Sequence, residues 1–549
     1  PITALPEPAP VVVWDNSNII ESYSGVTTPL TFSFALSVYE HVYRQFCQVM
    51  GVEESLLERN RPVFARMLGL IRGRIYYNLL NWYRVLALLP GFSFNREFME
   101  RMMGVREKLP DVDLPAPPRT GKAQDLWRLL RMAARMRSAH ARLPEQIRAF
   151  HARVEAVLAR YPTDLRGLSP GELLATYRRL EEDLLMHWKA PLVNDFFAMM
   201  AHGLLNRLVE RWLPGEATTL GNDLMCGEGG MISTEPAAAL ARLSHLDFES
   251  PAFREACREY LERFGDRSVG ELKLETETLR ENPEALLALA RSYREAGVSL
   301  DPGRGRELRR AAEARVVARL SGIKRSAFFA VLREARRGVR DRENLRFERT
   351  RVFALVRRIF LALGSHLARR GALEAERDVF YLTCEEVFGY FEGAGVTADL
   401  KALVELRRAE FAVYREEPAP PDRFETLGPP GRAPFSRVPG PGSREGLRGL
   451  GCCPGVVRAP VRVVRDPARA GDLRGCILVT ERTDPGWVVL FATVSGLAVE
   501  RGSMLSHSAI VAREMGIPCV VGVAGLMEAL RDGETVELDG SAGTVKRVC

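Results

Sequence analysis

One histidine near the C-terminal end of the sequence has a setting suited to phosphate chemistry. His507 lies between Ser506 and Ser508 at the junction of an expected loop and an expected helix. The N–H groups that open a helix, together with the helix dipole, favour an anion at such a junction. A neutral imidazole is a nucleophile toward phosphorus near pH 7, and the two hydroxyls can donate hydrogen bonds to phosphoryl oxygens. The pattern indicates a phosphoryl carrier, although a helix-opening histidine without any role has the same local pattern.

Phosphoryl transfer needs cations around the travelling group, and two places in the sequence could supply them. Arg342 and Arg346 are spaced i,i+4 on an expected helix, so both guanidinium groups can face one anion. Arg267, Glu271 and Lys273 form a second polar cluster beside two glycines, in which Glu271 is a candidate base or hydroxyl-orienting residue. Both groups also have a simpler interpretation, because arginine pairs often lie on solvated helix faces and a glutamate often pairs with a nearby arginine.

The other histidines and the aromatic segments are weaker candidates. His187, His202 and His366 lie in helical patterns, where a structural histidine is the usual outcome, and no two histidines have metal-ligand spacing. The aromatic stretch 76–83 and the glycine-rich stretch 225–231 could line a pocket for a small hydroxyl compound of apolar character, although aromatic stripes more often form core. The sequence identifies neither that acceptor, nor the general base, nor the oligomeric state.

Two unlike parts of the chain must position these residues. Residues 1–35 read as irregular to extended, and helical spacing then dominates to about residue 415, in the stretches 36–50, 55–90, 123–160, 170–212, 250–264, 283–296 and 303–369. Residues 416–446 are rich in proline and glycine and indicate a linker. Short β-branched strands alternate with helical stretches over residues 447–549. We expect a multidomain protein with a large, mostly α-helical acceptor-binding domain (1–415) and a small, tethered α/β domain (447–549) that carries His507.

Composition argues against several classes of function. The net charge is +7, and no basic patch interleaved with aromatic residues indicates nucleic-acid binding. The nine cysteines are scattered, and the adjacent pair Cys452-Cys453 does not have zinc-ligand spacing, so we expect reduced thiols, no metal site and a cytoplasmic location. No signal peptide is visible, and no apolar run reaches the roughly 20 residues of a membrane helix. The first residue is proline, so either an initiator methionine has been removed or the sequence is a piece of a longer protein.

A long, ordered motif surrounds His507. Residues 483–491 read Thr-Asp-Pro-Gly-Trp-Val-Val-Leu-Phe, and residues 502–518 contain Leu-Ser-His, Ala-Ile-Val-Ala-Arg-Glu and Gly-Ile-Pro. This motif resembles the mobile phosphohistidine domain of the phosphoenolpyruvate-utilising enzymes, in the form of the rifampicin phosphotransferase branch and its phosphoenolpyruvate-synthase-like relatives. Four stretches of the helical part are similar to the substrate-binding domain of that branch: 25–31, 264–272, 342–346 and 378–383. The Arg-Glu-x-x-basic pattern at 342–346 favours a functional role for Arg342 and Arg346. One departure is Gly502-Ser503, where the family usually has two glycines.

The resemblance implies a relay with a swivelling histidine domain. In such enzymes an ATP-grasp domain transfers the β-phosphate of ATP to the histidine, releasing AMP and phosphate, and the histidine domain delivers the phosphoryl group to an acceptor. No ATP-binding domain precedes the helical part, so we expect ATP and Mg²⁺ to be bound by an ATP-grasp partner or by a stretch missing from this sequence. The expected function is a dikinase-type phosphotransferase acting on a small-molecule hydroxyl. The alternatives are a ligase or condensing enzyme that uses a phosphorylated acceptor, and a non-catalytic ligand-binding module of the same fold.

Overall fold

The computed structural model describes residues 11–89, 122–216, 219–297, 302–427, 447–465, 467 and 470–548. The chain divides into two compact units, and both combine segments that are distant in the sequence. The first unit is Pro1–Val193, Leu272–Glu275 and Val352–Pro441, and the second is Asn194–Glu271, Thr276–Arg351 and Gly442–Cys549. The helical region predicted as one domain over residues 1–415 is therefore divided between the two units.

The first unit consists of helices and a small antiparallel sheet. Its helices are α1 (Pro29–Met50), α2 (Glu54–Arg59), α3 (Arg61–Phe64), α4 (Leu79–Ala87), α6 (Lys122–Leu158), α7 (Pro170–Asp183), α15 (Cys384–Glu392) and α16 (Leu400–Glu416), with the start of α8 (Lys189–Trp212) and the end of α14 (Gly322–Arg369). Short 3-10 turns lie at Ile19–Glu21, Leu185–His187 and Glu376–Tyr381. The strands β1 (Val11–Asp15), β2 (Leu68–Ile71), β3 (Arg74–Asn78) and β4 (Arg423–Leu427) pair in the order β2-β3-β1-β4.

A β-hairpin replaces part of the helix that the sequence pattern predicts over residues 55–90. Strands β2 and β3 pair antiparallel, with Leu70 opposite Ile75. Arg72 and Gly73 form the two-residue turn between them and both have positive φ, 45° and 69°. Such a turn matches the right-handed twist of the flanking strands. The helical prediction is wrong here because aromatic and β-branched side chains on a tight turn override an approximate 3.6-residue spacing.

Strand β4 lies inside the segment predicted as a linker over residues 416–446. It pairs with β1, with Phe424 opposite Trp14. The Phe424 side chain is buried, and its ring lies 5.3 Å from that of Tyr76 in an edge-on arrangement. The prediction of a linker is therefore wrong for residues 423–427, because an alternating pattern of five residues is hidden within a proline-rich composition. Residues 428–446 lie outside the described part of the chain.

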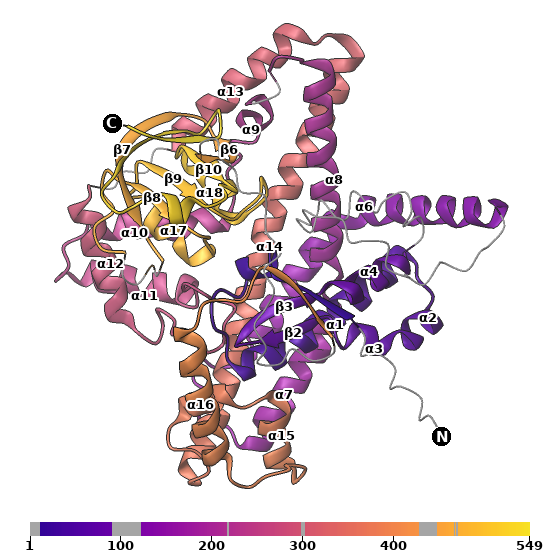
Figure 1. Ribbon diagram of the computed structural model, residues 1–549, viewed down its shortest axis with the longest axis vertical. Coiled ribbons are helices and arrows are strands. Elements are labelled where there is room, and N and C mark those ends of the chain that lie inside the picture. The colour runs from indigo at the N-terminus through magenta and orange to yellow at the C-terminus, as the bar shows by residue number, and fades with distance from the viewer. Residues whose placement is uncertain are drawn as a thin grey trace, which may run out of the picture. The chain divides into compact units, whose positions relative to one another are not determined.

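The second unit combines a group of helices with a larger sheet. Its helices are most of α8 and of α14, with α9 (Leu220–Leu224), α10 (Glu235–Ser244), α11 (Pro251–Phe264), α12 (Pro283–Glu295), α13 (Pro302–Arg319), α17 (Val488–Phe491), α18 (His507–Met515) and α19 (Leu526–Ala529) (Figure 1). Short 3-10 turns lie at Ile232–Thr234 and Pro485–Trp487. None of the described helices of either unit combines the length and the apolar character that crossing a membrane requires.

The larger sheet confirms the α/β pattern predicted for the C-terminal residues. Its strands are β5 (Leu447–Arg448), β6 (Leu450–Cys453), β7 (Val456–Val463), β8 (Ile477–Thr480), β9 (Gly496–Val499), β10 (Cys519–Val521), β11 (Thr535–Asp539) and β12 (Thr544–Arg547). They are ordered β5-β12-β11-β7-β8-β9-β10-β6, and β7, β8, β9 and β10 run parallel to one another. The central strands β8, β9 and β10 are buried along their whole length, as expected for parallel strands covered on both faces.

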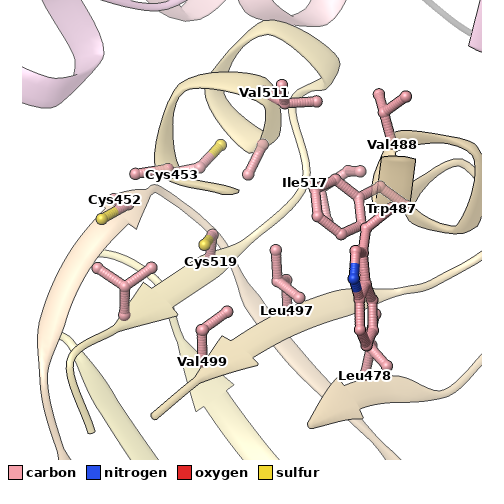
Figure 2. Close-up of a cluster of buried hydrophobic side chains, with 14 of the residues drawn as sticks. Cys452, Cys453, Leu478, Trp487, Val488, Leu497, Val499, Val511, Ile517 and Cys519 are labelled. Carbon is pink, nitrogen blue, oxygen red and sulfur yellow. The ribbon is translucent and has the colours of Figure 1, made fainter. Parts of the chain in front are cut away.

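Side chains of these central strands alternate between two apolar cores. Leu478, Leu497 and Val499 point into a core with Trp487 and Val511, which Figure 2 shows. The residues between them, Val479 and Ala498 among others, point into the core on the opposite face of the sheet.

Helix α18 lies between the sheet and the helices of the second unit. Its residues Ala509, Val511 and Ala512 pack on the sheet, whereas Ile510 packs among side chains of α8, α13 and α14. The first residue of α18 is His507.

Candidate functional site

His507 lies at the edge of the parallel sheet where β8 and β9 end. Strand β8 leads into Thr483-Asp484, and its neighbour β9 leads through residues 500–506 into His507. Because the carboxyl ends of adjacent parallel strands meet at one edge, the sheet brings together the two runs of the motif that are separate in the sequence. The Thr-Asp-Pro run and the histidine run therefore contribute to one region.

The N-terminal end of α18 is buried and has no side-chain cap. Ser506 has an extended backbone (φ −67°, ψ 156°), and its carbonyl accepts the first helical hydrogen bond, from Ile510 N at 3.1 Å. Its hydroxyl donates to the Ser503 carbonyl at 2.8 Å and makes no cap hydrogen bond to the helix. The first three N–H groups of the helix have no helical acceptor, and such groups favour a negative charge.

A carboxylate from α14 fixes the ring of His507. The distance from His507 Nδ1 to Glu343 Oε2 is 3.0 Å, and the two side chains are 3% and 2% exposed. The other ring nitrogen, Nε2, is buried and makes no hydrogen bond with any residue in the described part of the chain. One nitrogen of the ring is therefore held, and the other is free.

The charges of this pair follow from its surroundings. Burial disfavours a charged imidazole and lowers the pKa of His507, an effect that outweighs the hydrogen bond and negative charge of Glu343. Burial also opposes ionisation of Glu343, but the hydrogen bond from His507 and the charges of Arg346 and Arg342 hold the pKa of Glu343 well below its usual range. At neutral pH a neutral ring therefore donates Nδ1–H to an ionised carboxylate, which leaves the Nε2 lone pair available as a nucleophile.

The two serines predicted to bind phosphate make a local network. Ser506 Oγ and Ser508 Oγ lie 3.1 Å apart, and both residues are buried. Because the Ser506 hydroxyl donates to the Ser503 carbonyl, Ser508 is the donor in the hydrogen bond between the two serines. Either hydroxyl would have to rotate before it could donate to a phosphoryl oxygen.

Arg342 and Arg346 lie on either side of Glu343 along α14. Arg342 Nη1 donates to the Leu505 carbonyl at 2.8 Å, and its Nε lies 3.4 Å from Asp195 Oδ1. Arg346 Nη1 lies 3.4 Å from Glu343 Oε1. The structure thus brings both predicted arginines to the His507 region. In the described arrangement one holds the loop before the histidine, and the other pairs with the carboxylate that holds the ring.

Arg267 and Glu271 also belong to the second unit and are deeply buried. Their side chains are 6% and 3% exposed, with Arg267 Nε at 3.9 Å from Glu271 Oε2. Glu271 Oε1 accepts a hydrogen bond from Thr350 Oγ1 at 2.7 Å, and the Arg267 guanidinium lies over the Phe347 ring at 4.9 Å. The positive charge of Arg267 contributes to the lowered pKa of His507, although less than burial does, which places the guanidinium within electrostatic range of the imidazole.

Lys273, the third member of the predicted cluster, belongs to the first unit. Its Nζ donates to the carbonyls of Ser24 and Val26 at 3.0 and 2.7 Å. Within the first unit, Lys273 therefore stabilises the segment before α1. Arg267 and Glu271 belong to the other compact unit.

The other histidines and the aromatic stretch, which were the weaker candidates, have surroundings typical of residues that stabilise the fold. His366 Nε2 lies 2.7 Å from the Leu168 carbonyl, and Tyr76, Trp82 and Tyr83 of the aromatic stretch are buried core residues. Burial and nearby arginines lower the pKa of His202 to about 3, so the ring of this histidine is neutral.

The glycine-rich stretch 225–231 receives a side chain of α18. The backbone N–H groups of Glu228 and Gly229 donate to the Glu514 carboxylate, both at 3.0 Å. Positive φ angles at Gly227, Gly229 and Gly230 shape the loop that presents these groups. These two hydrogen bonds thus connect α18 to the helical part of the second unit.

Two acidic residues of this region were not found from the sequence. Glu343 is part of the Arg-Glu-x-x-basic pattern, which assigns no role to the glutamate, and its pairing with His507 spans 164 residues. Asp484 accepts hydrogen bonds from the Gly270 and Gly486 N–H groups at 2.9 and 2.8 Å, which joins the Thr-Asp-Pro run to the loop after α11. The motif itself carried the only signal for either residue.

The arrangement can support nucleophilic attack by an imidazole on phosphorus. It provides a buried, unprotonated Nε2, a carboxylate that holds the Nδ1 proton, a helix N-terminus without a side-chain cap and three arginines in one region. Among the described residues, no three histidine, cysteine, aspartate or glutamate side chains are grouped so that they could hold a metal ion.

Comparison with known proteins confirms the resemblance predicted from the motifs. Residues 472–543 match the family model described as PEP-utilising enzyme, mobile domain, and residues 242–343 match that of the rifampicin phosphotransferase fourth domain. The first match contains Asp484 and His507, and the second contains Arg267, Glu271 and Glu343. Both matched segments lie in the second unit except for residues 272–275.

Three relatives illustrate the extent of the similarity. A rifampicin phosphotransferase of a Streptomyces species is 32% identical over 53% of this chain and 34% of its own length. An uncharacterised protein of Mycobacterium tuberculosis strain H37Rv is 33% identical over 55% of this chain and 32% of its own length. The prodigiosin synthesizing transferase PigC of Serratia marcescens is 25% identical over 96% of this chain and 62% of its own length. The chain thus aligns with less than two thirds of each of these relatives.

Proposed function

We propose that this chain carries a phosphoryl group on His507 Nε2 and transfers it to a small-molecule hydroxyl, because residues 472–543 match the PEP-utilising enzyme mobile domain. The phosphotransferase relatives support an enzyme of this general type. The observation that carries the proposal is the buried pair of His507 and Glu343, in which Nδ1 is held at 3.0 Å and Nε2 is left without a partner among the described residues.

The pair suits both halves of a phosphoryl relay. In the first half, the Nε2 lone pair forms a bond to phosphorus while the bond between phosphorus and the donor's leaving group breaks and its electron pair goes to that leaving group. The Nδ1 proton stays on the ring and is shared with Glu343. The phosphorylated ring is then a cation, which the adjacent carboxylate stabilises. In the second half, the acceptor hydroxyl oxygen forms a bond to phosphorus and gives its proton to Glu271, the candidate base. The electron pair of the N–P bond returns to Nε2, so the leaving group is a neutral imidazole. A neutral leaving group makes the phosphorylated histidine a reactive donor.

The source of the phosphoryl group in this proposal is ATP with Mg²⁺, bound by an ATP-grasp domain or partner. The resemblance of the histidine domain supports this source. Because Nε2 is buried in the described arrangement, the ring must become accessible before it can accept a phosphoryl group. We therefore assign the described arrangement to the stage at which the histidine faces the acceptor-binding part, and we expect the domain to swivel away for loading.

The test is phosphorylation of the 549-residue chain in two arms. In one arm the chain is incubated with phosphoramidate, a small phosphoryl donor that needs no partner. In the other it receives an ATP-grasp domain of a rifampicin phosphotransferase and ATP labelled at either the β or the γ phosphate. We expect acid-labile label on His507 from phosphoramidate and from β-labelled ATP only. A His507→Asn variant must lose the label, and a His202→Asn variant, which changes another buried histidine, must keep it. A wild-type chain that stays unlabelled in both arms would refute the proposal.

A second candidate is favoured by the relative that aligns with nearly the whole chain. PigC is named a synthesizing transferase. A related activity here would use the phosphorylated acceptor as an activated intermediate for condensation with another molecule. The two candidates differ in the fate of the acceptor: a released phosphate ester supports phosphotransfer, whereas a condensed product with free phosphate supports synthesis. A module that only binds a ligand needs no unpartnered imidazole held by a buried carboxylate.

A further inference from the structure

Several polar atoms near His507 are buried without a hydrogen-bond partner among the described residues. They are His507 Nε2, Arg267 Nε, Arg267 Nη1 and Glu271 Oε2. All three side chains are at least nine-tenths buried. Buried polar groups in folded proteins are almost always paired, so several orphaned atoms in one region indicate the place of an absent polar molecule.

One face of α14 places these atoms in a row. Glu343, Arg346, Phe347 and Thr350 are spaced three or four residues apart and therefore share a face. Glu343 holds His507 at 3.0 Å, Phe347 lies under the Arg267 guanidinium at 4.9 Å, and Thr350 donates to Glu271 at 2.7 Å. With a rise of 1.5 Å per residue, Phe347 lies about 6 Å and Thr350 about 10 Å along the helix from Glu343. The Arg267 guanidinium is thus between the imidazole and the Glu271 carboxylate.

The Arg267 guanidinium packs on an aromatic ring, but its Nε and Nη1 donors make no hydrogen bond with the described residues. The Phe347 ring supports one face of the guanidinium, and Glu271 lies at 3.9 Å, too far for a hydrogen bond. Arg342 Nη1 already donates to the Leu505 carbonyl, and the Nε atom of Arg342, although it makes no hydrogen bond, lies 3.4 Å from the Asp195 carboxylate. Arg346 pairs with Glu343. Arg267 differs from the other two predicted arginines because two of its donors, Nε and Nη1, are orphaned and its side chain is only 6% exposed, so it is the arginine best placed to receive phosphoryl oxygens.

We propose that Arg267 and Glu271 form the pocket that holds the phosphoryl group while it is attached to His507, and that they hold it with one oxygen protonated. This inference rests on the proposed phosphorylation of His507. The Arg267 N–H groups donate to the unprotonated oxygens, and Glu271 Oε2 accepts a hydrogen bond from the protonated oxygen. The ligand class is a monoanionic phosphoryl group, because a donor pair and a carboxylate together match an anion that still carries one proton.

The charges of Arg267 and Glu271 should shift the pKa of the phosphoryl group in opposite directions, so the direction of each shift tests the proposal. A neighbouring cation favours the dianionic phosphoryl group, and a neighbouring carboxylate favours the protonated one. The 549-residue chain is loaded with phosphoramidate, and the ³¹P resonance of the phosphohistidine is followed against pH. The resonance is assigned to His507 by its absence in His507→Asn. We expect Arg267→Gln to raise the pKa of the phosphoryl group and Glu271→Gln to lower it, each by about one unit or more.

Controls separate charge from damage to the fold. Arg258→Gln removes an exposed arginine of α11 that pairs with Glu255, and it should leave the titration unchanged. Arg267→Lys keeps the charge and should bring the pKa back toward the wild-type value. If Arg267→Gln does not fold, the titration of Glu271→Gln alone tests the proposal, because removal of a carboxylate from the pocket must lower the pKa of the phosphoryl group.

The outcomes are distinct. Loaded variants that titrate like the wild type, as they would if the pocket held only water, overturn the assignment of Arg267 and Glu271. A wild-type chain that cannot be loaded on His507 instead overturns the proposed function itself.

Discussion

The pairing of Glu343 with His507 makes a sharp prediction for Glu343→Gln. The substitution keeps the size of the side chain and an oxygen that can accept a hydrogen bond, but it removes the charge. The amide can also present its N–H₂ group to Nδ1, which would move the ring proton to Nε2 and abolish the nucleophile. The perturbation therefore acts on the orientation and protonation of the ring rather than on the space around it.

The magnitude follows from the strength of the lost interaction. A hydrogen bond to a charged group contributes roughly 1.5–3 kcal/mol to an interaction, and each 1.36 kcal/mol corresponds to a factor of ten in rate. Both side chains are 3% exposed or less, so solvent does not screen the pair. We expect phosphorylation of His507 to be about 10- to 150-fold slower in Glu343→Gln.

The assay is the rate of phosphohistidine formation with phosphoramidate between pH 6 and 9. Removing the carboxylate removes an influence that raises the pKa of His507, so the pKa falls further and the ring stays neutral over this range. The slower rate should therefore persist at every pH. Glu348→Gln, which changes another buried glutamate of α14, serves as the control. A folded Glu343→Gln variant that is phosphorylated at the wild-type rate would show that the carboxylate does not prepare the ring.

The remaining predictions concern stability and the contact made by α18. Gly338→Ala should destabilise the chain by roughly 1–3 kcal/mol in thermal unfolding, because the new Cβ would lie 2.9 Å from Ala198. The control is Gly203→Ala on α8, where a new Cβ has nothing within 4 Å, so unchanged or greater stability is expected. Equal losses of stability in the two variants would contradict the packing argument. Glu514→Gln should increase hydrogen exchange in the loop 227–230, since one oxygen that accepts a backbone N–H is lost, whereas the exposed Glu528→Gln should not. The folded-state pKa of His507 lies below the unfolded value of 6.5, so its stabilising contribution is present above pH 6.5 and decreases as pH falls below it. Urea unfolding of His507→Asn should consequently show a weaker loss of stability over that pH range, and a wild-type slope in the variant would contradict the linkage.

The sequence by itself determined the local features of the protein. Strands at 477–480, 496–499 and 519–521 and the helix at 507–515 were predictable, because buried parallel strands are continuous β-branched runs and the helix follows a loop rich in glycine and serine. The role proposed for His507 also came from a contiguous motif. Where local patterns competed, prediction failed, as at Arg72-Gly73, where a two-residue turn makes a hairpin inside an apparent helix.

The tertiary structure alone decided which side chains act on His507. Glu343 meets the imidazole across 164 residues, and the local motif that contains Glu343 does not identify His507 as its partner. The same holds for the arginines. Spacing indicated Arg342 and Arg346, yet both have hydrogen-bond or ion-pair partners in the folded protein, whereas two donors of Arg267 are left without a hydrogen bond. Pairings of this kind depend on which helix face meets which loop. That geometry is set by the packing of the whole second unit, whereas motif and periodicity report only on residues that are close in the sequence.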